Sequence, residues 1–119
     1  MITAILVLVL GGSAGVARYL VDGAVQARQP STFPFGTLVV NVGGCFALGL
    51  LAGLHASAQT TLLLGTATIG SYTTFSTWML ESHRPAQDGE LNTAWRNLIV
   101  SLAAGLIFAA LGRTLGTAL

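Results

Sequence analysis

The chain alternates between long apolar runs and short polar stretches, and this pattern predicts four membrane-spanning helices. A helix needs about 20 apolar residues to cross the hydrocarbon core of a bilayer, and four segments are long enough. We expect one all-α membrane domain over residues 1–119, with helices at about 2–21, 34–54, 60–81 and 94–117. The first segment lacks the preceding basic region of a signal peptide and has too long an apolar run, so we expect it to be retained.

The polar links between these segments indicate how the chain crosses the membrane. Four crossings place both termini and the second link on one side, and the first and third links on the other. The latter side carries Arg28, Arg84 and Arg96, and the former carries Arg113. Because an excess of Arg and Lys sets the orientation of a membrane protein, this weak bias is typical of a chain that inserts both ways round.

Composition agrees with a membrane setting. Apolar residues make up 53% of the chain and charged residues 8%, whereas an average soluble domain is about 25% charged. No run of like charges is present, so nothing indicates a nucleic-acid partner. Glycine pairs with GxxxG spacing let helices pack closely in lipid and favour oligomerisation; they occur at Gly11 and Gly15, Gly49 and Gly53, and Gly112 and Gly116.

The sulfur and imidazole groups do not predict a metal or redox site. Cys45 is the single cysteine, and it lies in an apolar run. We interpret it as a small packing residue. His55 and His83 have no His, Cys or carboxylate partner at ligand spacing, so a zinc-type site is not expected.

The third segment contains a stretch of glycine and hydroxyl residues at its centre, GSYTTFST over residues 70–77. Gly70 weakens a helix, and Ser and Thr side chains bend helices by bonding to nearby carbonyls. Non-helical backbone at membrane depth survives only where protein or a water-filled path surrounds it. Two interpretations stay open from the pattern, a broken helix that exposes carbonyls and hydroxyls, and a plain helix with interhelical Ser and Thr hydrogen bonds.

A few other polar and aromatic residues share helix faces. Thr37 and Asn41 are four residues apart, as are Asn97 and Ser101, which places each pair on one face. Phe75 and the following Trp78 also share a face. They form either an ordinary packing pair or a mild partner for an anion through their positive ring edges. Arg18 and Glu81 end their segments, where long charged side chains extend to the interface.

The chain has no Asp, Glu, Lys or His in the middle of a segment. Proton-coupled transporters usually depend on such a residue. No nucleophile–base pair is visible either, so an enzyme is not expected. The interior polar groups are neutral hydroxyls, an amide and aromatic rings, which suit a small anion that must shed water and leave again.

Three blocks of sequence then point to a known family. They are GGSAGVARY at 11–19, FGTLVVN at 35–41 and GSYTTFST at 70–77. In this order and spacing the chain resembles the Fluc (CrcB) family of fluoride channels. The resemblance implies four transmembrane helices with the third broken at mid-membrane, in an antiparallel dimer inserted in both orientations. It also implies two pores that let fluoride leave the cytoplasm passively through the inner (plasma) membrane, which lowers fluoride toxicity.

The resemblance further implies the site residues. A structural sodium ion (Na+) would lie at the dimer interface, held by the backbone carbonyls of Gly70 and Thr73. The fluoride pathway would comprise Phe75, Trp78, Asn41, Thr37, Ser76, Thr77, Ser101, Arg18 and Glu81. The chain departs from the family pattern at three positions. Trp78 stands where a Phe is commoner, Ser71 stands where a second Gly is usual, and Asn97 stands where a tyrosine is often found.

The second subunit is either another copy of this chain or a paralogue, and the sequence leaves both open. Two other function classes also remain for comparison. A small multidrug transporter of four helices uses a membrane-embedded glutamate in its first helix, and the first segment here has no acidic residue. A structural subunit without transport of its own would have no need for a polar track through three helices.

Overall fold

The computed structural model describes residues 1–119 and is entirely helical. Its elements are α1 (Ile2–Arg28), α2 (Phe35–Gly53), α3 (Ala58–Thr60), the π-helix η1 (Thr61–Ile69), α4 (Gly70–Tyr72), α5 (Phe75–Gln87) and α6 (Leu91–Ala118). Three of them, α1, α2 and α6, are long and apolar enough to cross a membrane. The prediction of an all-α membrane protein is therefore confirmed at this level.

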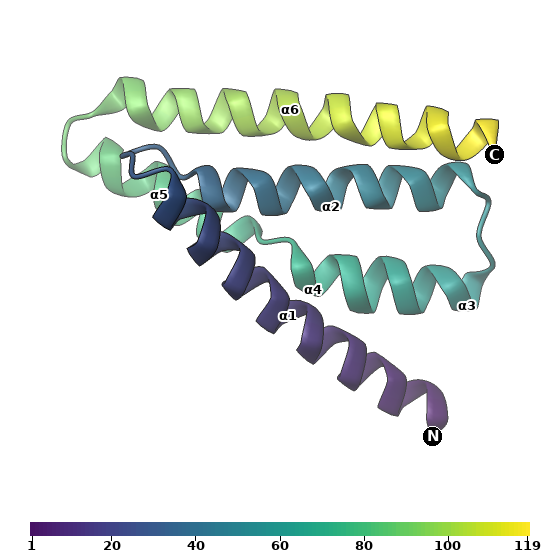
Figure 1. Ribbon diagram of the computed structural model, residues 1–119. Coiled ribbons are helices and arrows are strands. Elements are labelled where there is room, and N and C mark those ends of the chain that lie inside the picture. Colours follow the sequence, from purple (N-terminus) through teal and green to yellow (C-terminus); the bar gives the residue numbers. More distant parts are fainter.

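The helices lie side by side with their connections at two ends (Figure 1). Helices α2 and α6 run parallel and pack along their length, and the segment from α3 to α4 lies next to α2. Helix α1 packs against α2 and the η1–α4 segment, and its N-terminal part diverges from the rest. Both termini and the α2–α3 link lie at one end, and the other two links lie at the opposite end, as the polar stretches predict.

Glycines let the backbones of α2 and α6 approach closely. A Cβ added at Gly112 would meet the carbonyl oxygen of Phe46 and lie 2.9 Å from Leu50 N. A Cβ at Gly49 would likewise meet the carbonyl of Ala109. Close backbone approach gains van der Waals contact, which drives helix association in lipid. The helices are therefore tightly packed at two of the GxxxG pairs, Gly49 with Gly53 and Gly112 with Gly116, as the sequence predicts.

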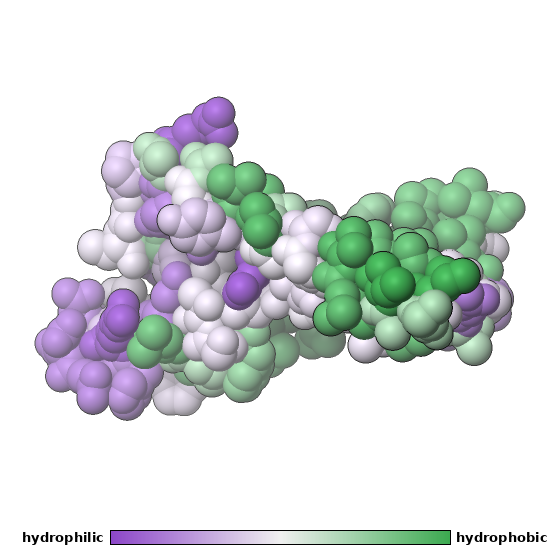
Figure 2. Space-filling view, turned by 90° about the horizontal axis from the view of Figure 1, so that it is seen from below, coloured by the Kyte–Doolittle hydropathy of each residue, from purple (hydrophilic) through white to green (hydrophobic).

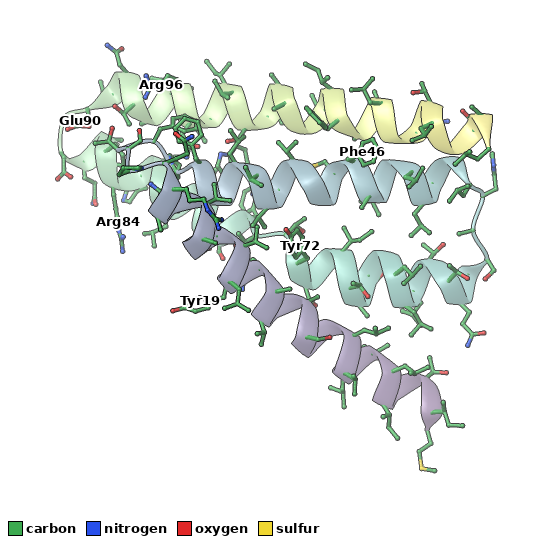
Figure 3. All side chains as sticks on the ribbon, in the orientation of Figure 1. Tyr19, Phe46, Tyr72, Arg84, Glu90 and Arg96 are labelled. Atoms are coloured by element: carbon green, nitrogen blue, oxygen red, sulfur yellow. The ribbon has the colours of Figure 1, made fainter.

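Large apolar side chains cover much of the outside. Only 17 of 119 residues are buried, and residues such as Leu8, Ile99 and Leu106 are more than half exposed. Figure 2 shows hydrophilic residues gathered at the end with the α1–α2 and α5–α6 links, and hydrophobic residues dominating the opposite side. Arg84, Glu90 and Arg96 lie at that hydrophilic end (Figure 3). Because an apolar surface of this extent is unfavourable in water, lipid or another subunit must cover it.

Two helices extend further than the apolar pattern predicts. Helix α1 continues to Arg28 instead of ending near residue 21, because no proline occurs before Pro30. Helix α5 continues to Gln87 and includes Pro85 in its last turn. The third segment, predicted over about 60–81 with a break at its centre, is interrupted at Thr73 and Thr74, which are both extended.

Replacing Gly49 by Ala is expected to force α2 and α6 apart. The added methyl has no space against the Ala109 carbonyl, so thermal unfolding in detergent should show a loss of about 1–3 kcal/mol, typical of overpacking. Gly43→Ala on the same helix is the matched control, because nothing lies within 4 Å of its Cβ position. Equal stability of the two variants would contradict the close α2–α6 approach.

Candidate functional site

The interruption at Thr73 and Thr74 organises the surrounding residues. Gly70 retains helical backbone angles of φ −61° and ψ −36°, but ψ rises to 161° at Thr73 and 117° at Thr74. Thr74 then caps α5, because its hydroxyl oxygen accepts from Thr77 N at 3.2 Å. The same hydroxyl donates to Thr77 Oγ1 at 2.9 Å. A Thr at the N-cap satisfies one of the free N–H groups of the new helix.

Asn41 of α2 holds the extended backbone from across the bundle. Its Nδ2 donates to the Thr74 carbonyl at 2.9 Å, and its Oδ1 accepts from Thr74 N at 2.8 Å. The side-chain amide thereby pairs with both polar groups of one residue, as a neighbouring β-strand would. Thr74 is buried at 8% exposure, so without Asn41 both groups would lack a partner.

These bonds release two carbonyl groups of the preceding helical stretch. In a continuous α-helix, Thr74 N bonds to the Gly70 carbonyl and Thr77 N bonds to the Thr73 carbonyl. Here Thr74 N donates to Asn41 and Thr77 N donates to the Thr74 hydroxyl. The Gly70 and Thr73 carbonyls therefore lose their ordinary helical donors, while no group of three His, Cys, Asp or Glu side chains exists elsewhere to hold a metal.

A groove of about 370 Å³ opens beside the break between α2, α5 and α6. Four predicted pathway residues lie on it, namely Asn41, Phe75, Trp78 and Ser101, as do Gly70 and Thr73. Phe75 is 69% exposed. Its ring meets Trp78 edge-to-face, with centroids 5.7 Å apart and an interplanar angle of 76°.

Trp78 is held against α6 by a chain of hydrogen bonds. Its indole Nε1 donates to the Asn97 carbonyl at 3.3 Å. Asn97 Nδ2 donates to Ser82 Oγ at 2.8 Å, and Ser82 Oγ donates to the Trp78 carbonyl at 2.9 Å. Ser101 Oγ donates to Asn97 Oδ1 at 3.2 Å. Asn97 is only 1% exposed. The hydrogen bonds of its side-chain amide to Ser82 and Ser101 therefore lie inside the protein.

The other predicted pathway residues lie away from the groove walls. Thr37 is buried, and its Oγ1 donates to Glu81 Oε1 at 3.0 Å. Glu81 Oε2 and Arg18 Nε are buried atoms without a hydrogen-bond partner. Ser76 is exposed in the first turn of α5. The structure thus joins Thr37 to Glu81, leaves Arg18 unpaired, and engages Thr77 at the cap; their roles toward an ion stay predictions.

Sequence reasoning missed Thr74 and Ser82 as individual residues. Thr74 is the capping residue and the partner of Asn41, and its signal was the Thr immediately before Phe75 where α5 begins. Ser82 is buried at 5% exposure and joins Trp78 to Asn97. Its spacing of four from Trp78 was the available signal, since i and i+4 share a face.

Comparison with known proteins now decides the family. The family model described as CrcB-like protein, Camphor Resistance (CrcB), matches residues 5–113. The chain belongs to this family. A relative from Mycobacterium bovis, named Fluoride-specific ion channel FluC 2, is 48% identical over 107 residues, which cover 90% of this chain and 85% of the relative.

Two further relatives are named Fluoride-specific ion channel FluC 1. The protein from Rubrobacter xylanophilus is 42% identical over 112 residues, covering 93% of this chain and 90% of the relative. The protein from Symbiobacterium thermophilum is 37% identical over 118 residues, covering 94% and 95%. The resemblance inferred from the three sequence blocks is confirmed, and so is the expectation of a protein that is not an enzyme.

Replacing Asn41 by Leu, which has a similar shape, removes both bonds to Thr74. We expect the free energy of unfolding to fall by about 2–4 kcal/mol, because each buried group left unpaired costs about 1–3 kcal/mol. Thermal unfolding in detergent measures the change. Asn92→Leu, at an exposed position near the start of α6, is the control, and equal stability of the two variants would show that Asn41 does not hold the break.

Proposed function

We propose that this chain is a fluoride-selective channel through which fluoride leaves the cytoplasm by passive flow, which lowers fluoride toxicity. The observation that carries the proposal is the break at Thr73 and Thr74 beside the groove, in a chain whose relatives are named fluoride-specific ion channels. Hydrogen fluoride crosses membranes as a neutral acid and ionises inside the cell. The trapped anion then needs an exit that does not require energy.

A broken helix offers opposite partial charges on its two sides. The stretch over 58–72 ends at the break with free carbonyls, and α5 begins there with its first N–H groups. Helix N-termini attract anions and C-termini attract cations. Phe75 and Ser76 occupy the first turn of α5, so an anion in the groove lies near the positive end of that helix.

The groove supplies the neutral contacts that suit a weakly held anion. The positive ring edges of Phe75 and Trp78, the Asn41 amide and the Ser101 hydroxyl lie along it. Thr37, Ser76 and Thr77 would continue the path on either side, and Arg18 Nε is an N–H donor without a partner. Conduction requires binding that is favourable enough to enter yet weak enough to leave, and neutral donors meet that requirement better than a ring of fixed cations.

We propose that the working unit is an antiparallel dimer with two pores, inserted in the inner (plasma) membrane in both orientations. The interrupted segment over 58–87 would be the third of four crossings, with its break at mid-membrane. Irregular backbone at that depth needs protein around it, yet Gly70 and Phe75 are exposed in the single subunit. A second subunit, either this chain or a paralogue, would cover them, and the weak Arg bias favours both orientations.

The Gly70 and Thr73 carbonyls fit the predicted structural sodium ion. Both have lost their helical donors to the Asn41 and Thr74 bonds, and oxygen ligands of this kind suit hard cations. When bound, sodium would neutralise the negative ends of the two helical stretches that meet at the interface. In a two-fold dimer each subunit would supply the same two carbonyls.

The proposal predicts fluoride efflux from liposomes that contain only the purified protein. A fluoride electrode should record rapid efflux under a fluoride gradient, with chloride loaded in parallel vesicles as the control ion. Chloride leaving as fast as fluoride would contradict selectivity, and no fluoride efflux would contradict the function. Replacing sodium by N-methyl-D-glucamine on both sides tests the cation, and unchanged efflux and dimer state would contradict a structural sodium ion.

Phe75→Ile is expected to slow fluoride efflux at least about tenfold, because it removes the aromatic edge that lines the groove while keeping an apolar side chain of similar bulk. Phe108→Ile is the matched control, since Phe108 lies on α6 outside the groove and is 42% exposed. Stopped-flow or electrode recordings compare the two. Equal efflux rates would remove the Phe75 ring from the mechanism.

A further inference from the structure

We infer that Asn97 is a positioning residue that fixes Trp78 on the α5–α6 wall of the groove. The inference rests on the proposed channel function only for its consequence for fluoride flow. The placement itself follows from the hydrogen bonds of Asn97, Ser82 and Trp78, which form a closed cycle between two helices.

The cycle ties Trp78 to one residue of α6 by two routes. The indole N–H reaches the Asn97 carbonyl directly, at 3.3 Å. The Trp78 carbonyl is bonded to Ser82 Oγ, and that oxygen accepts from Asn97 Nδ2. Ring and backbone of Trp78 are therefore both anchored to Asn97, and the ring cannot turn without breaking the first route.

Burial explains why the side chain of Asn97 matters to the indole bond. Asn97 is 1% and Ser82 5% exposed, so water does not compete for their hydrogen bonds. The bond from indole to carbonyl is long, close to the limit for a useful hydrogen bond. The shorter 2.8 Å bond between Asn97 and Ser82 holds α5 in register with α6 and keeps the indole within reach of that carbonyl.

The arrangement also accounts for the indole at this position. A phenylalanine would have no N–H to anchor and no need of an acceptor on α6, whereas a half-buried indole N–H usually finds one. Fixing Trp78 fixes its edge-to-face contact with Phe75, at 5.7 Å between centroids. Asn97 thereby controls the orientation of both rings on the groove without lining the groove itself.

The test uses Asn97→Leu in a Trp95→Phe background. The chain has two tryptophans, so this background leaves Trp78 as the only fluorescent indole, and Trp95 is an exposed residue on α6. We expect a lower fluorescence anisotropy of Trp78 and about tenfold slower fluoride efflux than the background protein, the effect of losing a buried hydrogen bond. Asn92→Leu in the same background should change neither quantity.

Ser82→Ala is the second variant, since it removes a single hydroxyl and disturbs the fold less. It should reproduce both effects, and combining it with Asn97→Leu should add nothing, because both remove the same link. Unchanged anisotropy in Ser82→Ala, or additive effects in the double variant, would overturn the inference. So would lower anisotropy with unchanged efflux. If the background protein shows no fluoride efflux, the proposed function is refuted instead. The fluorescence anisotropy of Trp78 would still show whether Asn97 fixes the ring.

Discussion

Two hydrogen bonds between the Asn41 amide and the backbone of Thr74 are the constraint on which the site depends. They replace helical bonds with bonds to a side chain of another helix. In a bilayer an unpaired backbone group costs several kcal/mol, so the helix can break only where a partner is supplied. Asn41 supplies both a donor and an acceptor at one place, and the chain is therefore free to leave the helical path there.

The rest of the site follows from that exchange. The Thr74 hydroxyl starts α5 by capping Thr77 N, and the Gly70 and Thr73 carbonyls lose their usual donors. Helix α5 is thereby displaced from the axis of the preceding stretch, and its Phe75 and Trp78 rings line the groove beside α6. The hydrogen-bond cycle of Asn97, Ser82 and Trp78 then sets how α5 lies against α6.

The sequence predicts the elements that depend on local composition. The apolar runs give α1, α2 and α6, and the charged stretches give the two ends at which the links gather. Helix α1 passes its predicted end near residue 21 because polar residues end an apolar run without ending a helix. The same reason extends α5 past Glu81 to Gln87.

The exact place of the break is not a local property. Gly70, the residue with the weakest helix propensity in the stretch, stays helical, and the chain leaves the helix at Thr73 and Thr74 instead. The partner that decides this is Asn41, 33 positions away in the sequence. Ser82 was not foreseen for a similar reason, since its role depends on Asn97 of another helix.

Backbone conformation at the break is the most direct test of this account. Carbonyl and Cα chemical shifts can be measured by solid-state NMR on the full chain in bilayers, with ¹³C-labelled glycine and threonine. We predict extended-type shifts at Thr73 and Thr74, between helical shifts at Gly70 and Thr77. Helical shifts at all four residues would show an uninterrupted helix and would contradict the account.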